Sequence, residues 1–338
     1  MGNQIIITAT DNIDLDRGYT FREGFIFAPL THPANLYDAI VIRNPEKADC
    51  WSPNWGFSKR SLEEHIQYVN DNQIEKAIII AEDIAFISQC PGLSYLQVIP
   101  ADLASSGSDY SPLYQMREIK YLSCNTIYGE RENLYSVIDY SKINGLIDLH
   151  ISVSKGEVGY EKASTLKSLN VSHYNKKDLT DLFCSENLDS LRMVKCYNTS
   201  LDGLEKTSNM QCLYLHYNRL LNDISALRKV KKTLKALRIE NCPKIEDFTV
   251  LGELDNLELL ELSGSNVLPS LDFVKTMLNL KTFVFNMNVL DGDLSPCLNL
   301  SYVFSEKNRK HYNLKDKDLP KGIYVRGNEH IEQWRRWE

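Results

Sequence analysis

The sequence predicts an α/β solenoid, in which a curved parallel sheet lines the concave side, short helical or 3-10 turns form the convex side, and a cap covers each end. Two observations predict it. First, the nine-residue segment 210–218 has apolar residues at its first, fourth and sixth positions, and relatives of this segment recur along the chain. Second, the recurrences lie 20 to 24 residues apart, a spacing typical of stacked repeats.

Seven segments share this pattern in one phase. Their first residues are Leu166, Leu188, Met210, Leu234, Leu257, Leu280 and Leu300. Their fourth residues are Leu169, Leu191, Leu213, Leu237, Leu260, Phe283 and Val303, and their sixth are Val171, Met193, Leu215, Ile239, Leu262, Phe285 and Ser305. Such alternation predicts a short strand that buries one face, and stacking the strands joins these faces into one core.

The ninth residue of each segment lies where the chain turns away from the strand. These residues are Tyr174, Cys196, Asn218, Cys242, Ser265, Asn288 and Asn308. We expect their polar groups to bond backbone groups of neighbouring turns, with Tyr174 and Ser265 departing from the pattern. The apolar spacings that follow, such as Leu201 with Leu204, suit single helical or 3-10 turns.

The pattern L-x-x-L-x-L-x-x-N/C of segment 210–218 resembles the leucine-rich repeat. The short units resemble the bacterial internalin-like class of that family. The resemblance covers roughly residues 75–308 and implies a curved solenoid that recognises another protein and catalyses nothing. Because such repeats serve very different pathways, the resemblance does not imply a particular partner.

Three regions are predicted: residues 1–72 as an N-terminal cap or small α+β region, 73–308 as the solenoid, and 309–338 as a C-terminal cap. In the first, 24–27 and 39–42 are typical of strands, and 61–69 of a helix that Ser61 and Glu64 begin with a capping box. In the last, 322–325 suits a final strand and 331–337 a short helix whose Trp334 and Trp337 cover the core.

Degenerate repeats are predicted between residue 75 and the clear series. Ile78 and Ile80 fit the fourth and sixth positions of one unit, and Leu96 and Val98 those of the next. The following unit is assigned the residues Met116, Ile119, Tyr121 and Cys124 at its first, fourth, sixth and ninth positions.

Net charge, apolar runs and cysteine positions disfavour several classes of protein. The 338 residues carry a formal net charge of −7, which disfavours a nucleic-acid or anionic-membrane surface. No apolar run approaches the length of a membrane span, and residues 1–6 lack the pattern of a signal peptide, so we expect a cytoplasmic protein. Of the eight cysteines, Cys196 and Cys242 fall two repeats apart, too far for a disulfide, which predicts reduced thiols.

Strand alternation directs the third, fifth and seventh residues of each unit to the concave face. The fifth and seventh positions there are rich in polar, Arg and Tyr side chains, which often dominate protein interfaces. We therefore predict a protein-binding face made of His150, Asn170, Arg192, Tyr214, His216, Arg238, Glu240 and Glu261. A solvated sheet face, with Arg238 and Glu261 merely paired to each other, is the alternative.

Two other functions stay open. One is an immunity or inhibitor protein that neutralises a toxin or enzyme, because the acidic balance would suit a basic target. The other is an enzyme whose site lies in residues 1–72, where Cys50, His32 and His65 could be assembled into a Cys–His pair. No histidine or cysteine pair has metal-ligand spacing and no glycine loop suits a phosphate, so we expect no metal, no cofactor and no catalysis.

Overall fold

The computed structural model describes residues 20–28, 39–43, 58, 60–81, 83–99, 109–124, 138–153, 158–182 and 185–325. The chain divides into two compact units, the first ending at Ala163 and the second beginning at Ser164. The boundaries predicted after residues 72 and 308 stay predictions. The segments proposed for 331–337, with Trp334 and Trp337, lie outside the described residues.

The strands of unit 1 lie side by side in the order β1 to β7. β2 pairs antiparallel with β1 and with β3, and from β3 onward the pairings are parallel. Its strands are β1 Thr20–Arg22, β2 Phe25–Ala28, β3 Ala39–Arg43, β4 Lys76–Ile80, β5 Tyr95–Ile99, β6 Tyr121–Ser123 and β7 Asp148–Ser152. Its helices are α1 Leu62–Asp71 and the 3-10 helices η3 Ala85–Gln89, η4 Ser111–Gln115, η5 Tyr140–Lys142 and η6 Tyr160–Lys162. Both early strands and the capping box of Ser61 with Glu64 are confirmed.

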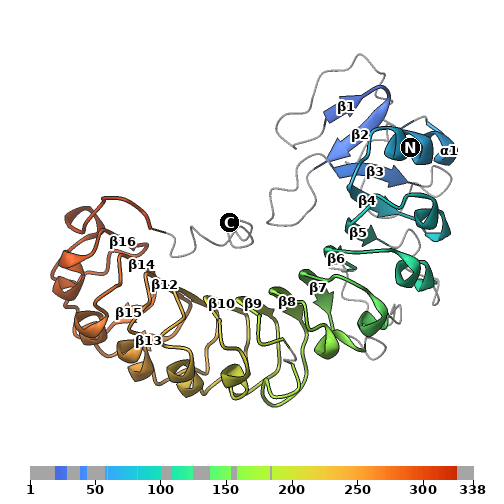
Figure 1. The fold of residues 1–338 in the computed structure, drawn as a ribbon. Coiled ribbons are helices and arrows are strands. Elements are labelled where there is room, and N and C mark those ends of the chain that lie inside the picture. Colours follow the sequence, from blue (N-terminus) through green and yellow to red (C-terminus); the bar gives the residue numbers. More distant parts are fainter. Residues whose placement is uncertain are drawn as a thin grey trace, which may run out of the picture. The chain divides into compact units, whose positions relative to one another are not determined.

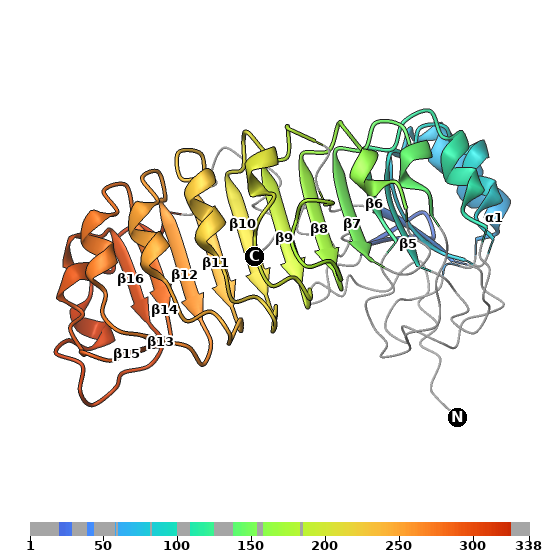
Figure 2. The same cartoon turned by 90° about the horizontal axis from the view of Figure 1, so that it is seen from below.

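Unit 2 is a parallel sheet whose strands follow one another in sequence (Figures 1 and 2). They are β8 Ser168–Ser172, β9 Ser190–Val194, β10 Cys212–His216, β11 Ala236–Glu240, β12 Leu259–Ser263, β14 Thr282–Phe285 and β16 Tyr302–Ser305. The 3-10 helices are η7 Leu204–Lys206, η8 Ser225–Lys229, η9 Thr249–Glu253, η10 Asp272–Thr276, η11 Ser295–Asn299 and η12 Asp316–Asp318. A second small sheet pairs β13 Val267–Leu268 with β15 Asn288–Val289.

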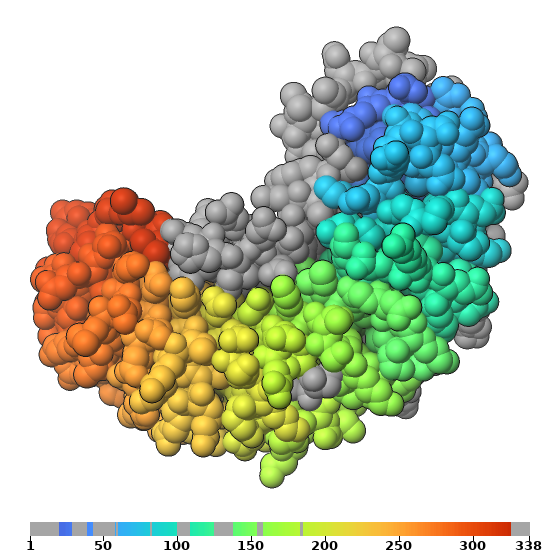
Figure 3. Space-filling view, viewed as in Figure 1, coloured from blue at the N-terminus to red at the C-terminus, as the bar shows by residue number. Residues whose placement is uncertain are grey.

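Within unit 2 the strands lie on the inner, concave side and the 3-10 turns η7–η11 on the outer side (Figure 1). Each repeat lies beside its neighbours in sequence, so the colours of unit 2 follow one another as adjacent bands in the space-filling view (Figure 3). The predicted leucine-rich-repeat solenoid, with a parallel sheet and 3-10 turns, is confirmed.

The register of the seven clear repeats is confirmed residue by residue. The predicted fourth positions are paired in an unbroken row, beginning with Leu169 and Leu191 and ending with Phe283 and Val303. The fourth and sixth side chains, Leu213 and Leu215 among them, are fully buried. Burial of this apolar face is what holds neighbouring repeats together.

Two of the degenerate repeats in unit 1 were assigned the wrong register. The structure aligns Ala77, not Ile78, with Leu96, and it aligns Leu122, not Ile119, with Leu96 and Leu149. The reason is an apolar cluster on the other face of this sheet, formed by Ile26, Ala28, Ala39, Val41, Ile78, Ile80 and Tyr121. Where both faces are apolar, alternation carries no information about register, and a slip by one residue exchanges the faces.

A left-handed residue turns the chain at the eighth position of four successive repeats. His173, Lys195, Tyr217 and Asn241 have φ between 51° and 57°. Each amide donates a hydrogen bond to the carbonyl oxygen of the seventh residue in the next repeat, as from Lys195 N to His216 O at 2.9 Å. These turns direct the eighth side chains to the edge of the sheet where the strands end.

Three of the ninth residues, Asn218, Cys196 and Cys242, bond neighbouring turns as expected. The Asn218 Oδ1 atom accepts from the Cys196 backbone N at 2.8 Å, and its Nδ2 donates to the Met193 carbonyl oxygen at 3.3 Å. The Cys196 and Cys242 thiols contact carbonyl oxygens at 3.5–3.7 Å. Ser265 is exposed, and the next residue, Asn266, is buried in its place and donates to two carbonyl oxygens.

The six described cysteines are free and buried. Burial raises the pKa of Cys196, Cys242 and Cys297 to about 12 each, which keeps these thiols protonated at neutral pH. In the part of the chain that the structure describes, no group of three or more His, Cys, Asp or Glu residues could hold a metal ion. No helix there has the length and apolar composition needed to cross a membrane.

Candidate protein-binding site

Seven of the eight predicted site residues lie in unit 2, on strands β8 to β12. The fifth-position column is paired in the predicted order: Asn170, Arg192, Tyr214, Arg238 and Glu261. In the seventh-position column, His216 is paired with Glu240. The eighth residue, His150, lies on β7 of unit 1, where it is buried with its ring edge-on to Tyr121.

Tyr214 is at the centre of a cluster of polar side chains. Its hydroxyl donates to Glu240 Oε2 at 2.5 Å, and the Arg192 guanidinium lies over its ring, 4.9 Å from the centroid. The His216 ring stacks on the Tyr214 ring with centroids 5.4 Å apart, and His216 Nε2 lies 3.3 Å from Glu240 Oε1. The sequence placed these four residues in two columns, and the structure joins the columns through Glu240.

Burial sets the charges of this cluster. It raises the pKa of Tyr214, and the hydrogen bond to Glu240 acts in the same direction, so the hydroxyl stays protonated and remains a donor. Burial also lowers the pKa of His216, with the Arg192 and Lys195 charges adding to the effect and Glu240 opposing it. The imidazole is therefore neutral at pH 7.

Arg238 and Glu261 form the second part of the site. Arg238 Nε lies 3.1 Å from Glu261 Oε2, as the alternative to a binding face anticipated. The other carboxylate oxygen of Glu261 accepts from the Tyr324 hydroxyl at 2.6 Å. Sequence reasoning missed Tyr324, because a contact across 63 residues has no local signal.

The segment that carries Tyr324 crosses the sheet from its last strand. Lys321 forms an isolated antiparallel bridge with Tyr302, and the Val325 backbone N donates to Thr282 Oγ1 at 2.9 Å. The Tyr302 and Tyr324 rings meet edge to face at 5.2 Å. The strand predicted for 322–325 is therefore wrong: these residues cover part of the concave face instead of extending the sheet.

The site is less exposed than a solvated strand face would be. Asn170, Tyr214 and Arg238 are each less than a tenth exposed. The side chains of His216, Glu240 and Glu261 are 21%, 34% and 25% exposed. A partner would thus meet Arg192, His216 and Glu240 first, with Tyr214 and Arg238 supporting them from below.

The suggested Cys–His pair in residues 1–72 can be followed only at His65, because Cys50 and His32 lie outside the described residues. His65 is buried beside Phe25, and its Nδ1 lies 2.8 Å from the Ser61 carbonyl oxygen. Since that oxygen can only accept, Nδ1 carries the proton. The Nε2 atom is buried without a hydrogen-bond partner.

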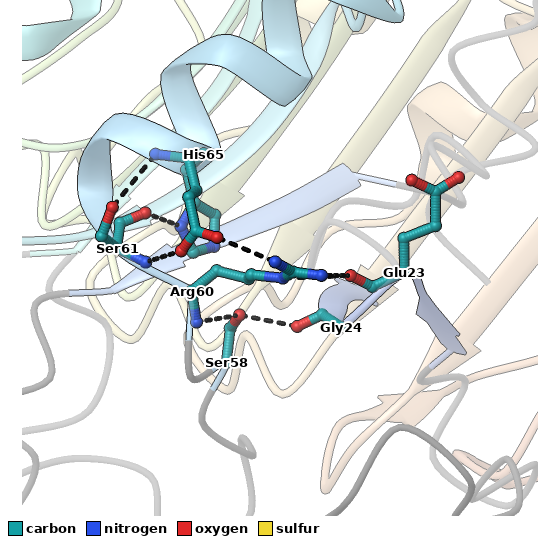
Figure 4. A network of polar contacts seen from close by, with 7 residues as sticks. Glu23, Gly24, Ser58, Arg60, Ser61 and His65 are labelled. Carbon is teal, nitrogen blue, oxygen red and sulfur yellow. Dashed lines mark hydrogen bonds and ion pairs between the residues drawn. The ribbon is translucent and has the colours of Figure 1, made fainter.

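The surrounding network explains why His65 is held there (Figure 4). Arg60 donates to the Glu23 carbonyl oxygen through two nitrogens and to Glu64 Oε1 at 2.8 Å. Ser58 Oγ donates to the Gly24 carbonyl oxygen at 2.7 Å. These bonds fasten the start of α1 to the turn between β1 and β2, which is a structural role.

Acid is expected to destabilise unit 1 through His65. Burial lowers the pKa of His65 below 6.5, with Arg60 acting in the same direction and the Ser61 bond and Glu64 opposing. The unfolded chain therefore binds more protons than the folded chain below pH 6.5, and the stability present above that pH is lost as the pH falls. The urea midpoint should decline from pH 8 to pH 5, and less steeply in His65→Gln.

His216→Gln serves as the comparison, because the pKa of His216 is lowered as well. The His216→Gln substitution should remove a separate part of the decline in the urea midpoint. An identical pH dependence in the wild type and in His65→Gln would show that His65 does not titrate with folding.

The fold is similar to that of solved leucine-rich-repeat structures. No protein-family model matches the sequence, and no curated protein matches it. Among solved structures, an internalin (InlF) from Listeria monocytogenes is 20% identical over 70% of this chain and 67% of its own, with a TM-score of 0.51. The functional domain of InlJ from Listeria monocytogenes is 19% identical over 71% of this chain and 49% of its own, with a TM-score of 0.38.

A leucine-rich-repeat protein of Leptospira interrogans is 14% identical over 74% of this chain and 82% of its own, with a TM-score of 0.34. At these identities only the fold is shared, and only the first internalin has a TM-score above 0.5 among these three structures. This chain has the architecture of a leucine-rich-repeat solenoid, similar to that of a bacterial internalin.

Proposed function

We propose that the chain is a non-catalytic recognition protein that binds another protein through the concave face of unit 2. The observation that carries the proposal is the cluster of Arg192, Tyr214, His216 and Glu240, in which stacking and hydrogen bonds hold polar and aromatic groups in place. Pre-organised side chains lose little conformational entropy when a partner binds. Arg and Tyr are also enriched among residues that dominate binding energy.

We also propose a cytoplasmic location. The alternative function is that of an immunity or inhibitor protein that neutralises a toxin or enzyme, since the net charge of −7 would suit a basic target. His150 lies in unit 1 and its side chain is buried, so the proposed face comprises only the seven residues of unit 2. The buried setting of His65 favours a structural role for this residue.

The test variant is Arg192→Gln with Glu240→Gln, which removes charge from the concave face without changing the core. Both substituted side chains are partly exposed, whereas replacing the buried Tyr214 or Arg238 would also affect stability. Affinity capture from the native host identifies a partner, and titration calorimetry with the purified partner then compares variants. We expect roughly tenfold weaker binding, the loss typical of a dominant interface residue.

The matched control is Arg228→Gln with Glu253→Gln, which also removes one cation and one anion. This pair is exposed on the convex turns η8 and η9, with Arg228 Nη2 3.5 Å from Glu253 Oε1. It should bind the partner as the wild type does. If the control loses affinity and the concave variant keeps it, the binding face lies on the convex side.

A further inference from the structure

The edge of the sheet at the carboxyl ends of β8 to β11 presents a separate surface. The strand arrows in this part of unit 2 point to one edge, so the turns that follow them lie side by side (Figure 2). We call this surface the basic rim. It comprises the exposed residues Lys176, Lys195, Tyr197, Tyr217, Arg219 and Lys244.

The rim differs in charge from the rest of the protein. The four turns 173–176, 195–198, 217–220 and 241–244 contain four Lys or Arg residues and no Asp or Glu, whereas the whole chain has a net charge of −7. Like charges on neighbouring turns repel one another, so this arrangement does not stabilise the fold.

Several cations elsewhere in unit 2 are paired with carboxylates of neighbouring repeats. Lys281 Nζ lies 2.8 Å from Glu258 Oε2, Arg228 lies 3.5 Å from Glu253, and Lys231 lies 3.8 Å from Asp255. Within the described ranges, none of the four rim cations forms such an ion pair. Ion pairs between neighbouring repeats are therefore possible in this fold, but the rim cations do not form them.

Three acidic residues close to the rim in sequence have hydrogen-bond partners of their own, whereas Glu246, two residues after Lys244, is exposed. Asp178 accepts from the Thr180 backbone N, and Asp247 accepts from the Thr249 backbone N. Glu240 accepts from Tyr214. None of these four carboxylates forms an ion pair with a rim cation in the described part of the chain, so the rim cations stay available to a ligand from outside.

Two exposed tyrosines lie in the rim, and one of them connects it to the concave cluster. Tyr197 is 52% exposed and Tyr217 is 38% exposed, so both rings are accessible to a partner. The Tyr217 ring lies 4.5 Å from the His216 ring, which stacks on Tyr214. Rim and concave cluster thus form one continuous surface.

We propose that the basic rim binds an acidic, extended segment of the protein partner. Carboxylates of that segment pair with Lys176, Lys195, Arg219 and Lys244, while Tyr197 and Tyr217 pack against its side chains. Four turns at about 4.8 Å per strand span roughly 14 Å, the length of four or five extended residues. This inference rests on the proposed function and adds the chemical class of the partner.

The test uses poly-L-glutamate as the probe and the full chain as the receptor. The rim variant combines Lys176→Gln, Lys195→Gln, Arg219→Gln and Lys244→Gln. The control variant combines Arg228→Gln, Lys231→Gln, Lys235→Gln and Lys281→Gln, which removes the same charge from paired positions. We expect the rim variant to bind the probe at least tenfold more weakly and the control variant within twofold of the wild type.

Three outcomes would overturn the inference: no binding of poly-L-glutamate by the wild type, equal losses in both variants, or tighter binding of single-stranded DNA of equal charge. The captured partner separates this inference from the proposed function. If the rim variant keeps the partner and Arg192→Gln with Glu240→Gln loses it, the concave face is the site and the rim is not. If both keep it, the proposed function fails as well.

Discussion

Replacing Leu215 by alanine is expected to lower the free energy of unfolding by about 2–5 kcal/mol, the range for large-to-small substitutions in a packed core. Leu215 is fully buried at the sixth position of its repeat. It lies between Met193 and Ile239, its register neighbours on β9 and β11. Both neighbours are held in the sheet by backbone bonds, so they cannot close the space that the side chain leaves.

Urea denaturation of the full chain measures this loss. Leu278→Ala is the control, because that leucine is 89% exposed and its truncation should cost less than about 0.5 kcal/mol. Similar costs for the two variants would contradict a continuous core beneath the sixth positions.

Replacing Asn218 by alanine is the second large effect that we expect. The variant leaves the buried Cys196 N–H and the Met193 carbonyl group without the partner that Asn218 supplies. Each buried polar group left unpaired costs about 1–3 kcal/mol, and the amide is fully buried, so water cannot replace it.

Asn175→Ala is the matched control, since Asn175 is exposed one position after the ninth residue of its own repeat. The same denaturation experiment compares the two. A cost for Asn218→Ala no greater than that for Asn175→Ala would show that the ninth position is not a structural bond between turns.

The sequence predicted unit 2 well because its strands have one apolar face. Position by position, Leu169 to Val303 are paired as the period implied. In unit 1 the predicted register was wrong by one residue at Ile78 and by three residues at Ile119, because apolar residues there occupy both faces of the sheet. Periodicity identifies a buried face only when the other face is polar.

For the candidate site, the sequence predicted which residues line up across neighbouring strands, but not which side chains contact one another. Alternation places Tyr214 and Glu240 on one face, but it does not report that a hydroxyl reaches a carboxylate on the next strand. The basic rim was missed because positions eight, ten and eleven lie beyond the alternating strand. A count of charges turn by turn, which gives Lys176, Lys195, Arg219 and Lys244 without one acid, would have found it.

The bond between Tyr324 and Glu261 changes how the end of unit 2 can unfold. Solenoids tend to lose terminal repeats one at a time, because each repeat contacts only its neighbours. Tyr324 follows the last strand, yet it bonds to β12, and Val325 bonds to β14 between them. The same segment is bridged to β16 between Lys321 and Tyr302, so it contacts the last three strands of the large sheet. We therefore expect these three strands to unfold cooperatively rather than one at a time.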